Sequence, residues 1–66
     1  MNNLHQTDFV IYDKANDHPV QFSDGSIVIY GNYEEAVADS SGNEIVIPCT
    51  ELPRHWQDEL IRQINN

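Results

Sequence analysis

The sequence predicts a small α+β domain of the order β-β-β-α-β-α, with one mainly antiparallel sheet and the C-terminal helix packed on it. Its first half alternates short apolar runs with turn residues, as strands and hairpins do. Two later segments repeat apolar residues at helical spacing. A chain of 66 residues has room for one domain, spanning 1–66, in which residues 1–7 are expected to be a loose polar end.

The first predicted strand covers residues 8–13 (DFVIYD). Successive side chains of a strand point to opposite faces, so Phe9 and Ile11 share one face and Val10 and Tyr12 share the other. Both faces of this strand are therefore apolar. We expect the helices to cover the sheet mainly on one side.

Two turns complete a predicted three-strand meander. Residues 14–19 (KANDHP) have turn composition, because Asn and Asp adopt left-handed conformations and Pro lacks an amide hydrogen. A short strand follows at 20–22. The Asp24-Gly25 pair then predicts a tight hairpin into a third strand at 27–30.

The second half begins with a short helix. Asn32 is the predicted N-cap, and Glu35 three positions later gives an approximate capping box. Acidic residues in the first turn also suit the positive end of the helix dipole. We expect the helix to end within residues 40–43 (SSGN), where Gly42 is free to adopt a left-handed conformation.

A fourth strand and a longer helix complete the chain. Residues 44–48 (EIVIP) predict the strand, and its pairing with either the third strand, in parallel, or the first strand stays open. The last helix is predicted from Thr50 as a candidate cap, with Pro53 in the first turn. Its apolar stripe should dock on the sheet and consists of Leu52, Trp56, Leu60 and Ile64.

Charge is the unusual global property of the chain. Eleven acidic residues against three basic ones give a formal net charge of −8. Direct binding to nucleic acid or to an anionic membrane is disfavoured, because both depend on Lys and Arg. The sequence contains no signal-peptide pattern and no apolar run long enough to span a membrane. We therefore expect a soluble protein in the cytoplasm.

The sequence favours a protein that is not an enzyme and that uses no cofactor and no metal. Its serines lie in turn-like stretches without a nucleophile-elbow pattern. The histidines have no zinc-binding spacing, and the three glycines form no phosphate-binding loop. The single cysteine, Cys49, follows an apolar strand and is expected to be an unreactive core thiol rather than a partner of His55.

Residues 18–39 (HPVQFSDGSIVIYGNYEEAVAD), followed by residues 44–53 (EIVIPCTELP), resemble short open reading frames of bacteria and phages. In these, a strand–proline–strand–glycine-turn unit precedes a helix with an E-E-A-like start. The resemblance implies an accessory protein of a phage or mobile element, a class that includes the anti-CRISPR proteins. Such proteins place carboxylates in basic grooves made for phosphates, and here the cytoplasm would be that of the host cell.

The predicted function is that of a non-catalytic acidic protein, a nucleic-acid mimic or anti-CRISPR-like inhibitor. It would occupy the basic surface of a host nucleic-acid-processing complex, because such a surface attracts any anionic partner. Caps and turns explain some of the acidic residues between positions 1 and 53. Apart from histidines, however, only Lys14 offers a countercharge to them in this part of the sequence. The predicted partner-binding residues are Asp13, Asp17, Asp24, Glu34, Glu35 and Asp39.

The alternative is a small acidic adaptor or homodimer whose charge serves only solubility. Its interface would be an exposed apolar sheet face, since the helices are expected to leave one face open. The residues of that face would be Val10, Tyr12, Val28 and Tyr30. Binding through charge weakens with ionic strength, whereas binding through this apolar face does not, so salt dependence separates the two functions.

Overall fold

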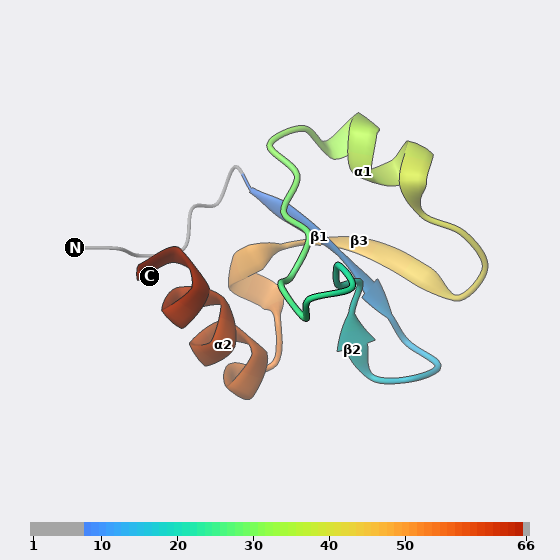
Figure 1. The fold of residues 1–66 in the computed structure, drawn as a ribbon. Helices are drawn as coiled ribbons and strands as arrows, with labels where there is room; N and C mark the ends of the chain where they lie inside the picture. The colour runs from blue at the N-terminus through green and yellow to red at the C-terminus, as the bar shows by residue number, and fades with distance from the viewer. Residues whose placement is uncertain (1–7, 66) are drawn as a thin grey trace.

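The computed structural model describes residues 8–65 and confirms the α+β class (Figure 1). The predicted loose end at residues 1–7 lies outside the described residues. The elements are β1 (Phe9–Asp13), β2 (His18–Pro19), α1 (Tyr33–Asp39), β3 (Glu44–Pro48), the 3-10 helix η1 (Cys49–Glu51) and α2 (Arg54–Asn65).

The sheet has the strand order β2-β1-β3, and both pairings are antiparallel. The longest pairing joins β1 to β3, from Phe9 opposite Pro48 to Asp13 opposite Glu44. The fourth predicted strand therefore pairs with the first and not with the third. This pairing puts the two longest strands of the described chain side by side, with β1 in the middle of the sheet and β3 at its edge.

The predicted meander is wrong in its details. The second strand is β2, which lies within the stretch predicted as a turn, and residues 20–22 and 27–30 form no regular strand. Instead, the 20–30 segment makes two isolated bridges, Gln21 with Ile27 and Phe9 with Tyr30. The segment nevertheless lies along the same side of β1 as β2, because Phe9 and Tyr30 exchange backbone hydrogen bonds of 2.7 and 2.8 Å.

The turns follow the sequence closely. Gly25 has a φ of +93°, and the Phe22 amide donates to the Ser26 carbonyl at 2.8 Å, so the predicted Asp24-Gly25 hairpin turn is present. Asp17 adopts a φ of +60° in the turn between β1 and β2, a conformation that Asp tolerates. Gly42 is left-handed as predicted, but it shapes the turn into β3, because α1 has already ended at Ser40.

The two helices lie on opposite faces of the sheet. In Figure 1, α1 lies above β1 and β3, and α2 lies below them. Helix α1 packs on β1 and β3, with the Phe9 and Tyr33 rings edge to face at 5.5 Å. The expected one-sided cover is therefore wrong. The apolar face proposed for the alternative function is also largely closed, since Val10 and Tyr12 are buried.

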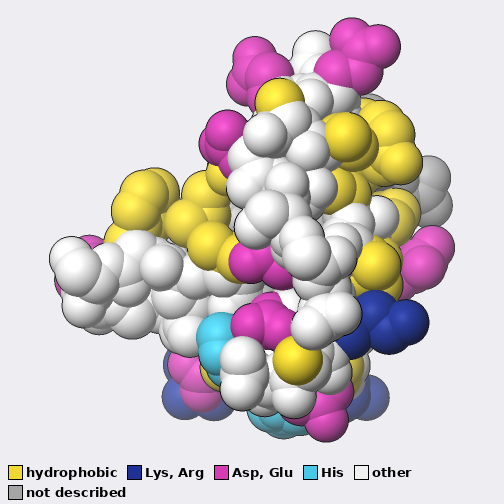
Figure 2. Space-filling view, turned by 90° about the vertical axis from the view of Figure 1, so that its right-hand side faces the viewer, with side chains coloured by type: hydrophobic (Ala, Val, Ile, Leu, Met, Phe, Trp, Pro, Cys, Tyr) yellow, Lys and Arg dark blue, Asp and Glu magenta, His cyan; other side chains and the backbone are white. Residues whose placement is uncertain are grey.

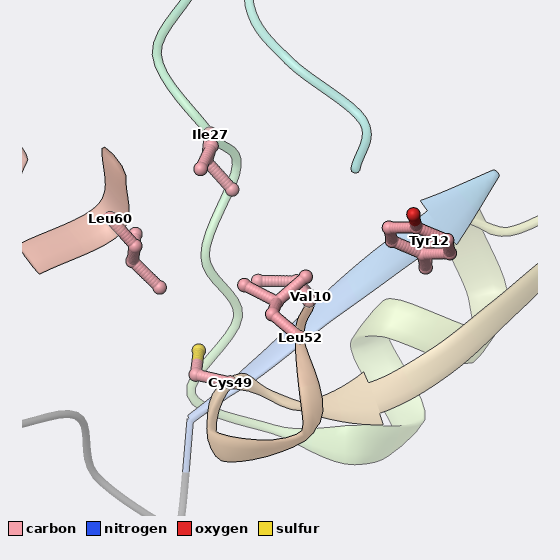
Figure 3. Close-up of a cluster of buried hydrophobic side chains, with 6 residues drawn as sticks. All are labelled: Val10, Tyr12, Ile27, Cys49, Leu52 and Leu60. Atoms are coloured by element: carbon pink, nitrogen blue, oxygen red, sulfur yellow. The ribbon is translucent and has the colours of Figure 1, made fainter. Parts of the chain in front are cut away.

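The core on the α2 side is one cluster that joins distant parts of the chain (Figure 3). Leu60 of α2 is fully buried there, whereas Trp56 packs against the cluster and is only partly buried. The predicted docking of the C-terminal helix is thus confirmed, with Leu60 rather than Trp56 as its deepest side chain. The buried members of the cluster are Val10, Tyr12, Ile27, Cys49, Leu52 and Leu60.

Both helix starts are held by polar side chains. Asn32 is the N-cap of α1, as predicted, and its Oδ1 accepts from the amides of Glu34 and Glu35 at 2.8 and 3.2 Å.

Thr50 does not cap α2, because it lies in η1. The Gln57 side chain of α2 instead donates to the Thr50 and Leu52 carbonyls, which fixes η1 against the first turn of the helix.

Candidate functional site

The carboxylates are the candidate functional groups, and all described ones lie at the surface. No polar or charged side chain is buried among residues 8–65. Their charge is unevenly divided along the chain. Helix α2 contains two acidic and two basic residues, so the whole net charge of −8 belongs to the residues before it. The surface built by the sheet, α1 and the turns is therefore strongly acidic.

Ion pairs follow the same division. The structure places two ion pairs within residues 8–65, Arg54 with Asp58 at 3.7 Å and Arg62 with Glu59 at 3.4 Å. Both join neighbouring turns of α2, and both are exposed to solvent. No carboxylate of the sheet, α1 or the turns has an ion-pair partner among the described residues. Within the part of the chain that the structure describes, their negative charge is therefore not paired with a cation.

Three carboxylates gather around the hydroxyl of Tyr30. This hydroxyl donates to Oδ2 of Asp39 at 2.8 Å. Burial raises the pKa of Tyr30, and the hydrogen bond to Asp39 and the negative charges of Asp39, Glu44 and Glu35 raise it further. Glu35 and Asp39 lie four residues apart on α1 and so share one helix face. We call Glu35, Asp39 and Glu44 the Tyr30 acidic group.

Asp13 extends this group across the sheet. It lies directly opposite Glu44 in the pairing of β1 with β3, where cross-strand side chains lie on the same face. Two like charges in such a pair repel each other. Asp13 also accepts hydrogen bonds from the amides of Ala15 and Asn16 and from the Asn16 side chain, which lower the pKa of Asp13. Its carboxylate is therefore fixed in place and ionised.

The other predicted residues lie apart from this group. Asp17 is in the β1–β2 turn, where its Oδ1 accepts from the Tyr12 hydroxyl at 3.3 Å. Asp24 is at the tip of the hairpin, and the amide and hydroxyl of Ser26 donate to it and lower its pKa. Glu34 is exposed in the first turn of α1. Figure 2 accordingly shows acidic side chains spread over one face, between hydrophobic and uncharged ones.

Sequence reasoning thus assembled only part of the acidic surface. Of the six predicted residues, the structure places Glu35 and Asp39 together and positions Asp13 across from Glu44. Glu44 was not among the six predicted residues. The helical spacing of Glu35 and Asp39 predicts that they are neighbours. The place of Glu44 depends on the register of β3, which the sequence leaves open.

Cys49 is the single cysteine of the chain, and it lies in the core. Cys49 is buried, and burial raises the pKa of its thiol to about 11, so the nucleophilic thiolate is scarce at neutral pH. Residues 8–65 contain no group of three or more His, Cys, Asp or Glu arranged to hold a metal ion. Among the described helices, none has the length and apolar character needed to cross a membrane.

Comparisons of the chain with protein-family models, with curated proteins and with solved structures gave no match. The charge and the geometry of this chain are therefore the features that bear on its function.

Proposed function

We propose that the protein is a non-catalytic acidic binding protein that occupies the basic, nucleic-acid-binding surface of another protein and inhibits it. The observation that carries this proposal is the division of charge. The residues before α2 carry the whole net charge of −8, and their carboxylates have no ion-pair partner among the described residues. A partner rich in Lys and Arg would neutralise these carboxylates and be drawn toward them over a long range.

The Tyr30 acidic group and Asp13 are the centre of the proposed surface. Hydrogen bonds from the Tyr30 hydroxyl and from the Ser41 amide hold Asp39 and Glu44, so these carboxylates lose little freedom on binding. Grouped carboxylates repel one another in the free protein. A basic surface converts this repulsion into attraction. The partners expected are host nucleic-acid-processing complexes, CRISPR effectors included, and the site of action is the host cytoplasm.

The test is capture of partners from bacterial lysate on the immobilised protein, followed by elution in a salt gradient and with duplex DNA. We expect basic nucleic-acid-binding proteins that moderate salt releases and that DNA displaces, because binding between charged surfaces is screened by salt. Partners that survive high salt and that DNA does not displace would contradict the proposal and favour the adaptor or homodimer.

Matched variants locate the surface. The variant Glu35→Gln/Asp39→Asn/Glu44→Gln removes three charges at the Tyr30 acidic group and keeps the oxygens that accept hydrogen bonds there. We expect it to weaken binding to a captured partner by about tenfold or more. The control Asp24→Asn/Glu34→Gln/Asp58→Asn removes the same charge at dispersed positions and should weaken binding less. Equal losses would show that only net charge matters.

Cys49→Ala serves as the control for chemistry. Because the thiol is buried and its pKa is raised to about 11, the proposal predicts full inhibition by a folded Cys49→Ala protein. Loss of inhibition in that folded variant would indicate an enzyme that uses this cysteine.

A further inference from the structure

One edge of the sheet is open. Strand β3 is the last in the order β2-β1-β3, so its outer side pairs with no other strand of residues 8–65. Hydrogen bonds at both ends of the β1–β3 pairing define which backbone groups face outward. The Cys49 amide donates to the Asp8 carbonyl at 3.0 Å, and the Lys14 amide donates to the Asn43 carbonyl at 3.4 Å.

These two bonds show which residues of β3 direct their backbone groups toward β1 and which direct them outward. In an antiparallel pair every second residue bonds to the partner strand, so Ile45 and Ile47 direct their backbone groups to β1. Glu44, Val46 and Pro48 direct theirs outward. The Glu44 amide already donates to the Ser41 carbonyl at 3.0 Å, and Pro48 has no amide hydrogen. Within the described residues, Val46 therefore provides the one outward amide of β3 without an intramolecular acceptor.

A shallow groove of about 370 Å³ lies beside this edge, on the α2 side of the sheet. Its apolar surface comes from Tyr12, Ile45, Ile47 and Pro53. Ile45 is 41% exposed, although its pairing partner on β1, Tyr12, is buried. The groove therefore presents apolar surface directly next to an unpaired strand edge.

The charges at the groove are mainly negative. Asp17 and Glu51 line it together with a single cation, Lys14. Glu44 adds a further carboxylate at the start of β3, on the opposite face of the sheet. Aliphatic side chains with a terminal positive charge fit such a groove, because the stem covers apolar surface while the head reaches the carboxylates.

We propose that an extended, basic segment of a partner protein adds to the free edge of β3 as a further strand. This inference rests on the proposed function and names the form in which the basic partner binds. Backbone pairing centred on Val46 supplies the attachment, with the outward carbonyls of Glu44, Val46 and Pro48 as acceptors. A Lys or Arg of the segment lies along Ile45 and reaches Asp17 and Glu51.

A second copy of the chain fits this edge less well. An antiparallel pairing of two β3 strands about Val46 would bring together two molecules that each have a net charge of −8. Glu44 and Pro48, which flank Val46, are residue types that natural edge strands use against self-association. The charge of the surface thus selects a basic occupant.

The experiment uses three synthetic probes with the intact, isotope-labelled protein: a short peptide of alternating Thr and Lys, the same peptide N-methylated at every amide, and a Thr-Glu peptide. We expect the Thr-Lys peptide to shift the Val46 amide resonance and slow its exchange with solvent. N-methylation, which blocks strand pairing without changing charge, should weaken binding by about tenfold. The Thr-Glu peptide should not bind.

Protein variants test the groove. Asp17→Asn/Glu51→Gln should weaken binding of the Thr-Lys peptide by roughly threefold to tenfold, and the control Asp24→Asn/Glu34→Gln should change it less. Asn preserves both the left-handed conformation at position 17 and an acceptor for the Tyr12 hydroxyl.

Three results would overturn the inference. If both Lys peptides shift acidic residues equally and leave Val46 unprotected, the edge is not the site, but the proposed function stands. If the Thr-Glu peptide binds as well as the Thr-Lys peptide, charge does not select the occupant. If Val46 is already protected without peptide and the protein sediments as a dimer, a second copy occupies the edge.

Discussion

Gln63 and Ile27, 36 positions apart in the chain, are joined by two hydrogen bonds. The Gln63 Oε1 accepts from the Ile27 amide at 2.8 Å, and its Nε2 donates to the Ile27 carbonyl at 3.0 Å. The bridge between Gln21 and Ile27 leaves these backbone groups of Ile27 pointing away from Gln21. The side-chain amide of Gln63 thus takes the place that a neighbouring strand would have, and it fixes α2 to the 20–30 segment.

We expect Gln63→Ala to destabilise the protein by about 1–3 kcal/mol, because it leaves the amide and carbonyl of a buried residue without partners. Urea denaturation measures this loss. Gln21→Ala is the matched control, since the Gln21 side chain donates a single exposed hydrogen bond to the Gly25 carbonyl. A loss no larger for Gln63→Ala than for this control would show that the bonds to Ile27 add no stability.

Local signals in the sequence predicted the parts of the fold that depend on neighbouring residues. Asn32 caps α1 and Gly25 turns the hairpin because the conformations of a few adjacent residues decide both features. The pairing of β3 with β1 and the bonds from Gln63 to Ile27 join distant residues, so no local pattern contains them. The sequence predicts strands at residues 20–22 and 27–30. In the structure, the Gln63 side chain, and not a neighbouring strand, bonds to the backbone amide and carbonyl of Ile27.

The candidate site divides in the same way. Glu35 and Asp39 are neighbours by helical spacing alone, which the sequence contains. Glu44 lies near them only because of the register in which β3 pairs with β1. Asp24 lies apart from them, because it is at the tip of the hairpin. The free edge at Val46 was not predicted, because it follows from the strand order and from the use of the Glu44 amide in a turn.

Leu60→Ala should destabilise the protein more than Trp56→Ala. Leu60 is 0% exposed at the centre of the core cluster, and a buried Leu→Ala change costs about 2–5 kcal/mol. A domain of this size has a total stability of roughly 3–10 kcal/mol, so Leu60→Ala is expected to be partly or largely unfolded. Trp56 is partly exposed and donates one 3.3 Å hydrogen bond to the Asp17 carbonyl, which implies a smaller loss.

Thermal and urea denaturation of both variants compare these losses. Ile64→Ala is the control on the same helix, because Ile64 is 39% exposed and its loss should matter little. A larger loss for Trp56→Ala than for Leu60→Ala would contradict the assignment of Leu60 as the anchor of α2.

Alkaline pH should destabilise the fold. Burial raises the pKa of Cys49 from about 9 to about 11, and burial also raises the pKa values of Tyr12 and Tyr30. Each of these groups is neutral when protonated, and the fold favours the neutral form. Their contribution is complete below the pKa of the unfolded state and is lost as the pH rises from about 9 through about 11.

The urea midpoint measured as a function of pH tests this expectation, with Cys49→Ala as the comparison. The variant has no thiol to ionise, so its midpoint should fall less steeply over the same interval. Parallel curves for the two proteins would show that the Cys49 thiol has the same pKa folded and unfolded.

Acidic pH should also destabilise the fold, because the contribution of the hairpin carboxylate Asp24 to stability is lost as the pH falls. Hydrogen bonds from the side chain and the amide of Ser26 lower the pKa of Asp24, because they favour the ionised carboxylate. Its contribution to stability is therefore present above the ordinary pKa of an aspartate and is lost as the pH falls through the lowered pKa. Asp24→Asn keeps an acceptor for Ser26 but has no charge to lose.

The difference in urea midpoint between the parent protein and Asp24→Asn should therefore shrink as the pH is lowered, and Glu34→Gln provides the comparison of an exposed carboxylate on α1. The measurement at neutral pH compares two opposing effects of removing the Asp24 charge. Removing an acidic residue from a surface with a net charge of −8 relieves repulsion, whereas removing the bonded charge of Asp24 weakens the turn. A parent protein less stable than Asp24→Asn at neutral pH would show that repulsion exceeds the hydrogen bonds of the turn, and that the acidic surface lowers the stability of the free protein.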